Sequence, residues 1–279
     1  MKIAITGASG LIGSRIVELL QNDFEFLSLS IEDMDITDPD SVESNLANLD
    51  FDLFLHLAGY TNVDGAENQK ELAHKINVEG TKNVFDFVSK KNKKFIYIST
   101  DFIFDGKNPP YFEDSTPDPT GYYAQTKYEG EKIVNNNAMI VRLSYPYRAN
   151  YEIKKDLVRK LIDYLKQGTQ LKMITDSLIT PTFVDDIAYS LKYLMNNYSP
   201  EIYHVVGADS LSPYDAANLI AKTFNLDESL IVPTTFEEYS KDKAVRSQYS
   251  QIKSKKNNFH SMKTFEEGLN EIKIQMTKL

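Results

Sequence analysis

The N-terminal segment "KIAITGASGLIG", residues 2–13, constrains the fold more than any other part of the chain. A short apolar, β-branched run predicts a buried strand, and it leads directly into a helical pattern over 7–22. Gly7, Gly10 and Gly13 stand between the two. In that setting the first glycine permits a tight turn, the second lets backbone approach a pyrophosphate, and the third lets helix and sheet pack closely. Although the spacing is the variant G-x-x-G-x-x-G, its context predicts a dinucleotide site rather than a merely flexible loop.

Alternating strand and helix signals follow this loop and set the fold class. Further apolar runs predict strands at 24–30, 51–59, 93–100 and 138–145. Between them lie a short helix within 35–49 that Asp38 or Asp40 would cap, a helix over 71–92, and a helix that contains Tyr123. Such alternation implies crossover connections and a parallel sheet covered on both faces. We therefore expect an α/β fold with a doubly wound parallel sheet over residues 1–150.

The pattern loosens beyond Pro146 and predicts a second, smaller region over residues 151–279. Helices are expected at 154–168, 184–197 and 213–225, and strands at 171–175 and 201–207. We expect most of this region to close over the sheet as a smaller lobe that binds substrate. The stretch 182–207 is expected to pack back onto the first domain.

Composition excludes several kinds of chemistry. A net charge of -9 argues against a nucleic-acid partner, because a phosphate backbone demands clustered Lys and Arg. The chain has no cysteine, so disulfides and thiolate nucleophiles are absent. No metal-ligand spacing occurs among the four histidines, and we predict no metal site: His56, His74, His204 and His260. No apolar run approaches the roughly 20 residues of a membrane helix, and no signal peptide precedes the glycine loop, so a cytoplasmic protein is expected.

Charge near the end of the second predicted strand bears on the choice of dinucleotide. Around Ser30 lie Glu32, Asp33 and Asp35, and no basic residue occurs between Arg15 and Lys70. A free 2′-hydroxyl is bound by a hydrogen-bond acceptor at this place, whereas a 2′-phosphate is bound by a cation. The region therefore leans towards NAD. Arg15, in the first turn of the helix, is the alternative: it either reaches a 2′-phosphate or is simply solvated.

Tyrosines four residues before a lysine share a helix face with it, and this chain has five such pairs among its seventeen tyrosines. The pairs are Tyr123/Lys127, Tyr128/Lys132, Tyr151/Lys155, Tyr239/Lys243 and Tyr249/Lys253. Spacing alone cannot single out a reactive pair, since at least four of them are accidents. The position of each pair in the fold has to identify the reactive one.

Several segments, taken in order, carry a family resemblance. After the glycine loop come "HLAGYTNVDGAE" (56–67), "INVEGTKNV" (76–84), "ISTDFIFDG" (98–106), "YYAQTKYEGE" (122–131) and "TPTFVDDIA" (180–188). Together they resemble the extended short-chain dehydrogenase/reductases, and more narrowly the dTDP-4-dehydrorhamnose reductase branch, over essentially the whole chain. The resemblance implies a Rossmann domain that binds NAD(P)H and a C-terminal region that grips a nucleotide-sugar. A homodimer is a candidate assembly.

The same resemblance implies a catalytic set of Tyr123, Lys127 and Thr100, with Thr100 favoured over Ser99 by the match to S-T-D. The physics fits these roles. A phenol is a poor acid at neutral pH unless its anion is stabilised, and an ammonium one helical turn away stabilises it. Thr100 would add a hydrogen bond to the substrate oxygen as charge develops there. Tyr128 is left as a bystander.

Further residues are implied on the cofactor and substrate sides. The resemblance assigns to the cofactor Gly7, Ser9, Gly10, Leu11, Ile12, Gly13, Arg15, Asp35, Ile36, Leu57, Ala58, Gly59, Asn77, Tyr123 and Lys127. It assigns to the substrate Tyr60, Asp64, Asp101, Phe102, Tyr145 and Arg246, with Tyr147 and Arg148 as further candidates for stacking and for a phosphate. Asp35 could instead cap a helix, and each substrate residue could be a loop or core residue.

The chain departs from the branch in two places that bear on the substrate. "RSQYSQIK" (246–253) lacks the proline and aspartate of R-P-x-x-S-x-L-D, and Phe102 stands where many relatives have tyrosine. The leading hypothesis is reduction of a nucleotide-linked 4-keto-6-deoxy sugar. The alternatives are an epimerase or dehydratase, disfavoured because no Glu follows Asp101, and a non-catalytic cofactor-binding subunit, like the regulatory subunit of methionine adenosyltransferase.

Overall fold

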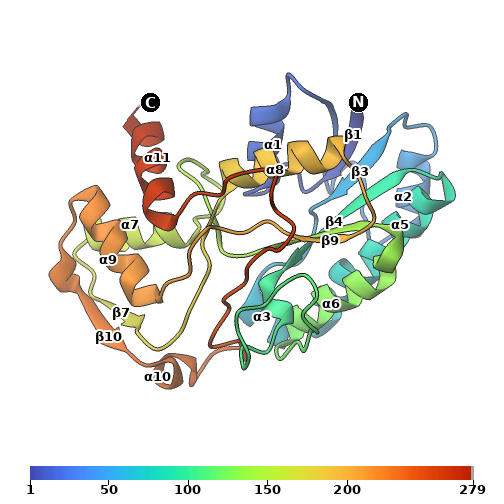
Figure 1. Ribbon diagram of the computed structural model, residues 1–279. Helices are drawn as coiled ribbons and strands as arrows, with labels where there is room; N and C mark the ends of the chain where they lie inside the picture. The colour runs from blue at the N-terminus through green and yellow to red at the C-terminus, as the bar shows by residue number, and fades with distance from the viewer. Residues whose placement is uncertain (278–279) are drawn as a thin grey trace.

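A computed structural model describes residues 1–277 and is organised around a six-stranded parallel sheet (Figure 1). The strand order is β2-β1-β3-β4-β5-β9. The bounds of these strands are β1 Lys2–Thr6, β2 Glu25–Leu29, β3 Leu53–His56, β4 Lys94–Thr100, β5 Met139–Leu143 and β9 Ile202–His204. The order reverses direction between β1 and β3, which is where a doubly wound sheet opens a ligand crevice beyond the carboxyl ends of its strands. The doubly wound parallel sheet expected from the sequence is confirmed.

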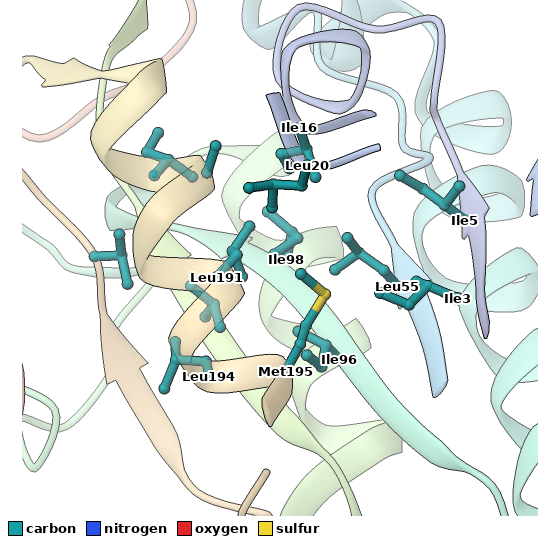
Figure 2. Packing of buried hydrophobic residues seen from close by; sticks show 14 of the residues in the cluster. Ile3, Ile5, Ile16, Leu20, Leu55, Ile96, Ile98, Leu191, Leu194 and Met195 are labelled. Carbon is teal, nitrogen blue, oxygen red and sulfur yellow. The ribbon is translucent and has the colours of Figure 1, made fainter. Parts of the chain in front are cut away.

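Helices cover both faces of this sheet. Those of the sheet domain are α1 Gly13–Leu20, α2 Pro39–Leu46, α3 Val63–Asn68, α4 Lys70–His74, α5 Thr81–Lys90, α6 Tyr122–Val134 and α8 Val184–Asn196. On one face α1 and α8 lie side by side, and Figure 2 shows Ile16 and Leu20 of α1 meeting Leu191 and Met195 of α8 above the sheet. On the other face α2, α5 and α6 bury apolar side chains against Phe54 and neighbouring strand residues.

The second region has its own hydrophobic core beside the sheet domain. Its elements are β6 Pro146–Tyr147, α7 Leu157–Lys166, β7 Leu171–Ile174, β8 Thr182–Phe183, α9 Pro213–Phe224, β10 Ile231–Thr234, α10 Phe236–Ser240 and α11 Phe265–Thr277. Helices α7, α9 and α11 share this core and gather at one side of the molecule in Figure 1. Helix α8 and strand β9, from the same half of the chain, belong instead to the sheet domain. Within 1–277, no helix has both the length and the apolarity needed to cross a bilayer.

The helix expected over 71–92 is one helical path with a change of pitch. It begins as α4, passes through a π-helical segment, Lys75–Gly80, and continues as α5. Asn77 lies in this widened turn. Its side chain hydrogen-bonds to the backbone amide and carbonyl of Tyr60. Insertions of this kind are frequent at functional sites. The helix was predicted without this change of pitch, because the apolar pattern over 71–92 continues through the segment.

The glycine loop is shaped by two close approaches of backbone. Gly7 has a φ of +71°, and a Cβ there would lie 2.9 Å from the amide nitrogen of Ala58. A Cβ on Gly13 would lie only 2.2 Å from the carbonyl oxygen of Gly7. The loop therefore turns tightly against the segment after β3, and the first residue of α1 sits on the turn itself, as the spacing predicted.

We predict that Gly7→Ala costs clearly more stability than Gly168→Ala. Both glycines have a φ of +71°, but nothing lies within 4 Å of a Cβ added at Gly168. The control therefore carries only the left-handed backbone cost of about 1 kcal/mol, whereas Gly7→Ala adds an overpacking cost of about 2 kcal/mol. Urea denaturation of the two variants measures the difference in free energy of unfolding, and equal losses would contradict the proposed packing.

Candidate active site

Helix α6 places Tyr123 and Lys127 on the face that lies against β4. Both side chains are buried. The Lys127 ammonium donates a hydrogen bond to the carbonyl oxygen of Ile98 at 2.8 Å and lies 4.1 Å from the centroid of the Tyr97 ring. The hydroxyl of Tyr97 in turn donates to the backbone oxygen of Lys127 at 3.2 Å. One turn of α6 is thus locked to the end of β4 through its lysine.

Burial lowers the pKa of Lys127 to about 7, since desolvation disfavours the charged form, while the carboxylate of Glu131 acts in the opposite direction. Glu131 lies one helical turn beyond Lys127 and is itself buried. It accepts two hydrogen bonds from Arg142 of β5, at 2.9 and 2.7 Å. The sequence analysis did not single out Glu131, although its spacing of four residues from Lys127 placed it on the same helix face.

Tyr123 stands beside Thr100, the last residue of β4. Burial raises the pKa of the Tyr123 phenol to about 12, and a hydrogen bond with Thr100 opposes this rise. The ring of Phe102 packs edge-on against that of Tyr123, with centroids 5.8 Å apart. The structure therefore brings together the three residues of the expected catalytic set. The neutral phenol is the stable form at physiological pH, which suits a proton donor.

Asp101 adds a buried carboxyl next to this group. Burial raises its pKa to about 7, and hydrogen bonds from Ser144 and Thr100 limit the rise. Their hydroxyls lie 2.9 and 3.1 Å from the carboxylate oxygens. The negative charge of Asp101 also contributes to the raised pKa of Tyr123. Sequence reasoning placed Asp101 near the sugar, but it did not find Ser144, the residue that holds the carboxylate.

The glycine loop and the segment after β3 meet at the carboxyl edge of the sheet, which is where a doubly wound fold binds a dinucleotide, and this edge continues to the same group. Leu57, Ala58 and Gly59 follow directly after β3, and a Cβ on Gly59 would lie 4.0 Å from the Lys127 amine. Asn77 lies behind Gly59, accepting from the backbone amide of Tyr60 at 2.7 Å and donating to Thr126 at 2.9 Å. Gly7, Gly10 and Gly59 carry no side chains of their own at the points where a pyrophosphate and a nicotinamide ribose would approach, so these residues fit a nicotinamide dinucleotide.

Acidic side chains stand near the end of β2, where an adenosine ribose would bind. Asp33 accepts hydrogen bonds from the backbone amide and hydroxyl of Ser30, and Asp35 closes a turn by accepting from Thr37. The N-cap of α2 is Asp38, so Asp35 does not cap a helix. Ile36 is buried against Gly80.

The Arg15 guanidinium is turned away from this end of the crevice. It makes two hydrogen bonds to Asp185 of α8, both at 2.7 Å, and a further ion pair with Glu18. Neither of the roles considered from sequence, a 2′-phosphate ligand or a solvated side chain, describes this pairing, which spans 170 positions of sequence.

On the substrate side, Tyr145 and Phe102 form an aromatic wall. Their ring centroids lie 6.1 Å apart, and Tyr145 has a φ of +38°, a strained value for a residue with a side chain. Asp64 and Arg246, two further predicted substrate residues, form an ion pair with each other. Tyr60 donates from its hydroxyl to Gln69 at 2.9 Å.

Two further sequence-based candidates lie elsewhere. Of the two roles considered for Tyr147, stacking on a sugar and packing in a core, the structure shows the second: the residue is 1% exposed and its ring packs against Phe183 and Phe265 in the second core. Arg148 points to the glycine loop, not to a sugar phosphate. It donates to the carbonyl of Leu11 and the hydroxyl of Ser14.

Tyr128 and Lys132, the competing pair on α6, face a different space. They line a cavity of about 490 Å³ bounded by α6, β9 and residues 255–256. The Lys132 amine lies 5.2 Å from the centroid of the Tyr128 ring. This is the surface stacking expected of an accidental pair. Within residues 1–277, no group of three or more His, Asp or Glu side chains is placed to hold a metal ion.

The sequence and the fold are both similar to those of known proteins. A family model described as the RmlD substrate binding domain matches residues 1–277. The fold is similar to the crystal structure of a dTDP-4-dehydrorhamnose reductase from Bacillus anthracis str. Ames in complex with NADP, with a TM-score of 0.91 and 30% identity over 98% of this chain and 99% of that one.

Curated relatives span most of the chain as well. It is 29% identical to the spore coat polysaccharide biosynthesis protein SpsK of Bacillus subtilis, over 89% of this chain and 88% of SpsK. It is also 29% identical to methionine adenosyltransferase 2 subunit beta of Bos taurus, over 84% of this chain and 75% of that protein.

We predict that Lys127 gives the protein a distinctive pH dependence of stability. Its pKa falls from 10.5 to about 7 on folding. Between these values the unfolded chain binds more protons than the folded one, so the contribution of Lys127 to stability rises with pH. From pH 7 to pH 9 the wild type should gain about 2 kcal/mol relative to Lys127→Met. Urea denaturation of both proteins at the two pH values measures this gain. Parallel pH profiles of the two proteins would contradict the lowered pKa of Lys127.

Proposed function

Because the chain belongs to the RmlD substrate binding domain family, we propose that it uses a reduced nicotinamide dinucleotide to convert the ketone of a nucleotide-linked 4-keto-6-deoxy sugar into an alcohol. The observation that carries this proposal is the meeting of Thr100, Tyr123 and Lys127 at the carboxyl end of β4, beside a glycine-lined crevice. The relation to a dTDP-4-dehydrorhamnose reductase of known structure supports the same reaction class.

The residues of this site divide the work of ketone reduction. A bound nicotinamide cofactor would supply the hydride. Tyr123 would then deliver a proton to the substrate oxygen, and Thr100 would hold that oxygen by a hydrogen bond as negative charge develops on it. Lys127, fixed on Ile98, would stabilise the tyrosinate that remains by direct charge attraction. Phe102 and Tyr145 would cover the sugar and keep water from the reacting atoms.

The intact catalytic set distinguishes this proposal from its alternatives. A cofactor-binding subunit without catalysis, suggested by the relation to methionine adenosyltransferase 2 subunit beta, would have no need of a buried lysine with a lowered pKa. A dehydratase would need a further acid next to Asp101 to expel water, and Phe102 occupies that position.

We also propose that the enzyme favours NADH over NADPH. At the adenosine end of the crevice Asp33 is exposed and ionised, since hydrogen bonds from Ser30 lower its pKa. The nearest guanidinium, that of Arg15, is committed to Asp185. A 2′-phosphate would therefore meet negative charge without a partner, whereas a 2′-hydroxyl would meet acceptors.

We expect Tyr123→Phe to lower kcat by a factor of about 10²–10⁴, the usual contribution of a positioned general acid, while leaving the Kd for NADH unchanged. Tyr128→Phe is the matched control, because it removes a hydroxyl from the same helix outside the site. Steady-state assays with a dTDP-linked 4-keto-6-deoxy sugar measure both. Retention of activity by Tyr123→Phe would remove this residue from the mechanism.

For the cofactor, kcat/KM with NADH should exceed that with NADPH by about tenfold, the effect of one missing charged contact. Arg15→Ala should leave this ratio unchanged, because the Arg15 guanidinium serves Asp185. A selective loss of NADPH-dependent activity in Arg15→Ala would show that Arg15 releases Asp185 to bind the 2′-phosphate, contrary to the proposal.

A further inference from the structure

A strap formed by residues 148–156 crosses the glycine loop from the second region. The hydroxyl of Tyr151 donates to the carbonyl oxygen of Ser9 at 2.7 Å. Further along, the amine of Lys154 reaches the hydroxyl of Thr61 at 3.2 Å. Since Ser9 follows β1 and Thr61 follows β3, the strap spans the mouth of the crevice between these two strands.

The strap is held in place by a buried ion pair. Asp156 and Arg159, both 7% exposed, are joined by a hydrogen bond of 2.7 Å. Arg159 also donates to the backbone carbonyls of Tyr151 and Lys154, and Asp156 accepts from the backbone amide of Arg148. The backbone on both sides of the crevice mouth is therefore fixed from the second region, and Lys154 extends from a supported position.

The charge of Lys154 has no counter-ion nearby. Within 1–277, no carboxylate lies within 4.0 Å of its amine, whereas the neighbouring Lys155 is paired with Asp163. The other cation of the strap, Arg148, is paired with Glu18. Desolvation and the neighbouring charge of Lys160 lower the pKa of Lys154, although its side chain remains exposed at the surface.

The two loops after β1 and β3 cannot supply such a cation themselves. The glycine loop after β1, residues 7–12, contains no Lys or Arg. None occurs between Arg15 and Lys70 either, and this part of the chain includes the loop after β3. Thr61 lies two residues beyond Gly59, the residue next to the Lys127 amine. The Lys154 ammonium therefore stands at the rim of the reaction site, where the diphosphate of a bound nucleotide would carry two negative charges.

We propose that Lys154 is a diphosphate-binding residue and that the strap exchanges its contact with Thr61 for a contact with the phosphates of a ligand in the crevice. This inference rests on the proposed function, because both a nicotinamide dinucleotide and a nucleotide-sugar carry a diphosphate. An ammonium recognises it as a compact point charge. The strap thereby adds the positive charge that the acidic first half of the sheet domain lacks.

The test compares Lys154→Met with Lys155→Met, which removes an adjacent lysine whose charge is already paired outside the crevice. The Kd values for NADH, dTDP and thymidine are measured by isothermal titration calorimetry on the full chain. We expect Lys154→Met to weaken binding of NADH, dTDP or both by about tenfold or more, the usual effect of one charge-assisted hydrogen bond. Thymidine, which has no phosphate, should bind equally to all three proteins.

Each outcome decides one point. Loss confined to NADH places Lys154 on the cofactor diphosphate, and loss confined to dTDP places it on that of the sugar nucleotide. Unchanged Kd values in Lys154→Met would overturn the role of Lys154. An equal loss of affinity in Lys155→Met, or for thymidine, would overturn it too. Neither result would touch the proposed function. Failure of the wild type to bind either NADH or dTDP would instead overturn the proposed function.

Discussion

The buried ammonium of Lys127 is the interaction on which the candidate active site depends. A charged group inside a protein is costly unless its hydrogen bonds and charge are compensated. Here the carbonyl of Ile98, the face of the Tyr97 ring and the carboxylate of Glu131 offset part of that cost, and the rest lowers the pKa of Lys127 to about 7. These partners fix helix α6 relative to the end of β4. Because Tyr123 is one turn away on the same helix and Thr100 ends the same strand, the contact that satisfies Lys127 also sets the geometry of the proposed chemistry.

Long-range ion pairs join the two regions of the chain around the crevice. Arg15 of α1 is clamped by Asp185 of α8, and Arg148 of the strap reaches Glu18 of α1. Helix α8 and strand β9 return from the second half of the chain to complete the sheet domain. The strap is therefore attached through α1 to the glycine loop.

Local signals made most of the fold predictable from sequence. Gly7, Gly10 and Gly13 were placed correctly because the turn they form needs no information from outside the segment. The six strands of the sheet followed from short apolar runs. Tyr123 could be separated from Tyr128 only by family motifs, since their helical spacing to lysine is the same, and the structure separates them by burial.

Features that depend on distant partners were out of reach. The π-helical segment contains Asn77, whose side chain bonds to the loop of Tyr60, a partner that no local pattern encodes. The sequence left Tyr147 open between a ligand-stacking residue and a core residue, because Phe183 and Phe265, which bury it, lie far along the chain. The partner of Arg15 lies on a helix whose return to the sheet decides that the guanidinium points away from the crevice.

The most direct measurement of the central claim is mass spectrometry of a dTDP-linked 4-keto-6-deoxy sugar incubated with the purified protein and NADH deuterated at the transferable C4 position. Reduction by hydride transfer with a proton delivered by Tyr123 predicts a product that has gained one deuterium and one hydrogen, together with an equal amount of oxidised cofactor. A sugar of unchanged mass, with the cofactor still reduced, would contradict the account.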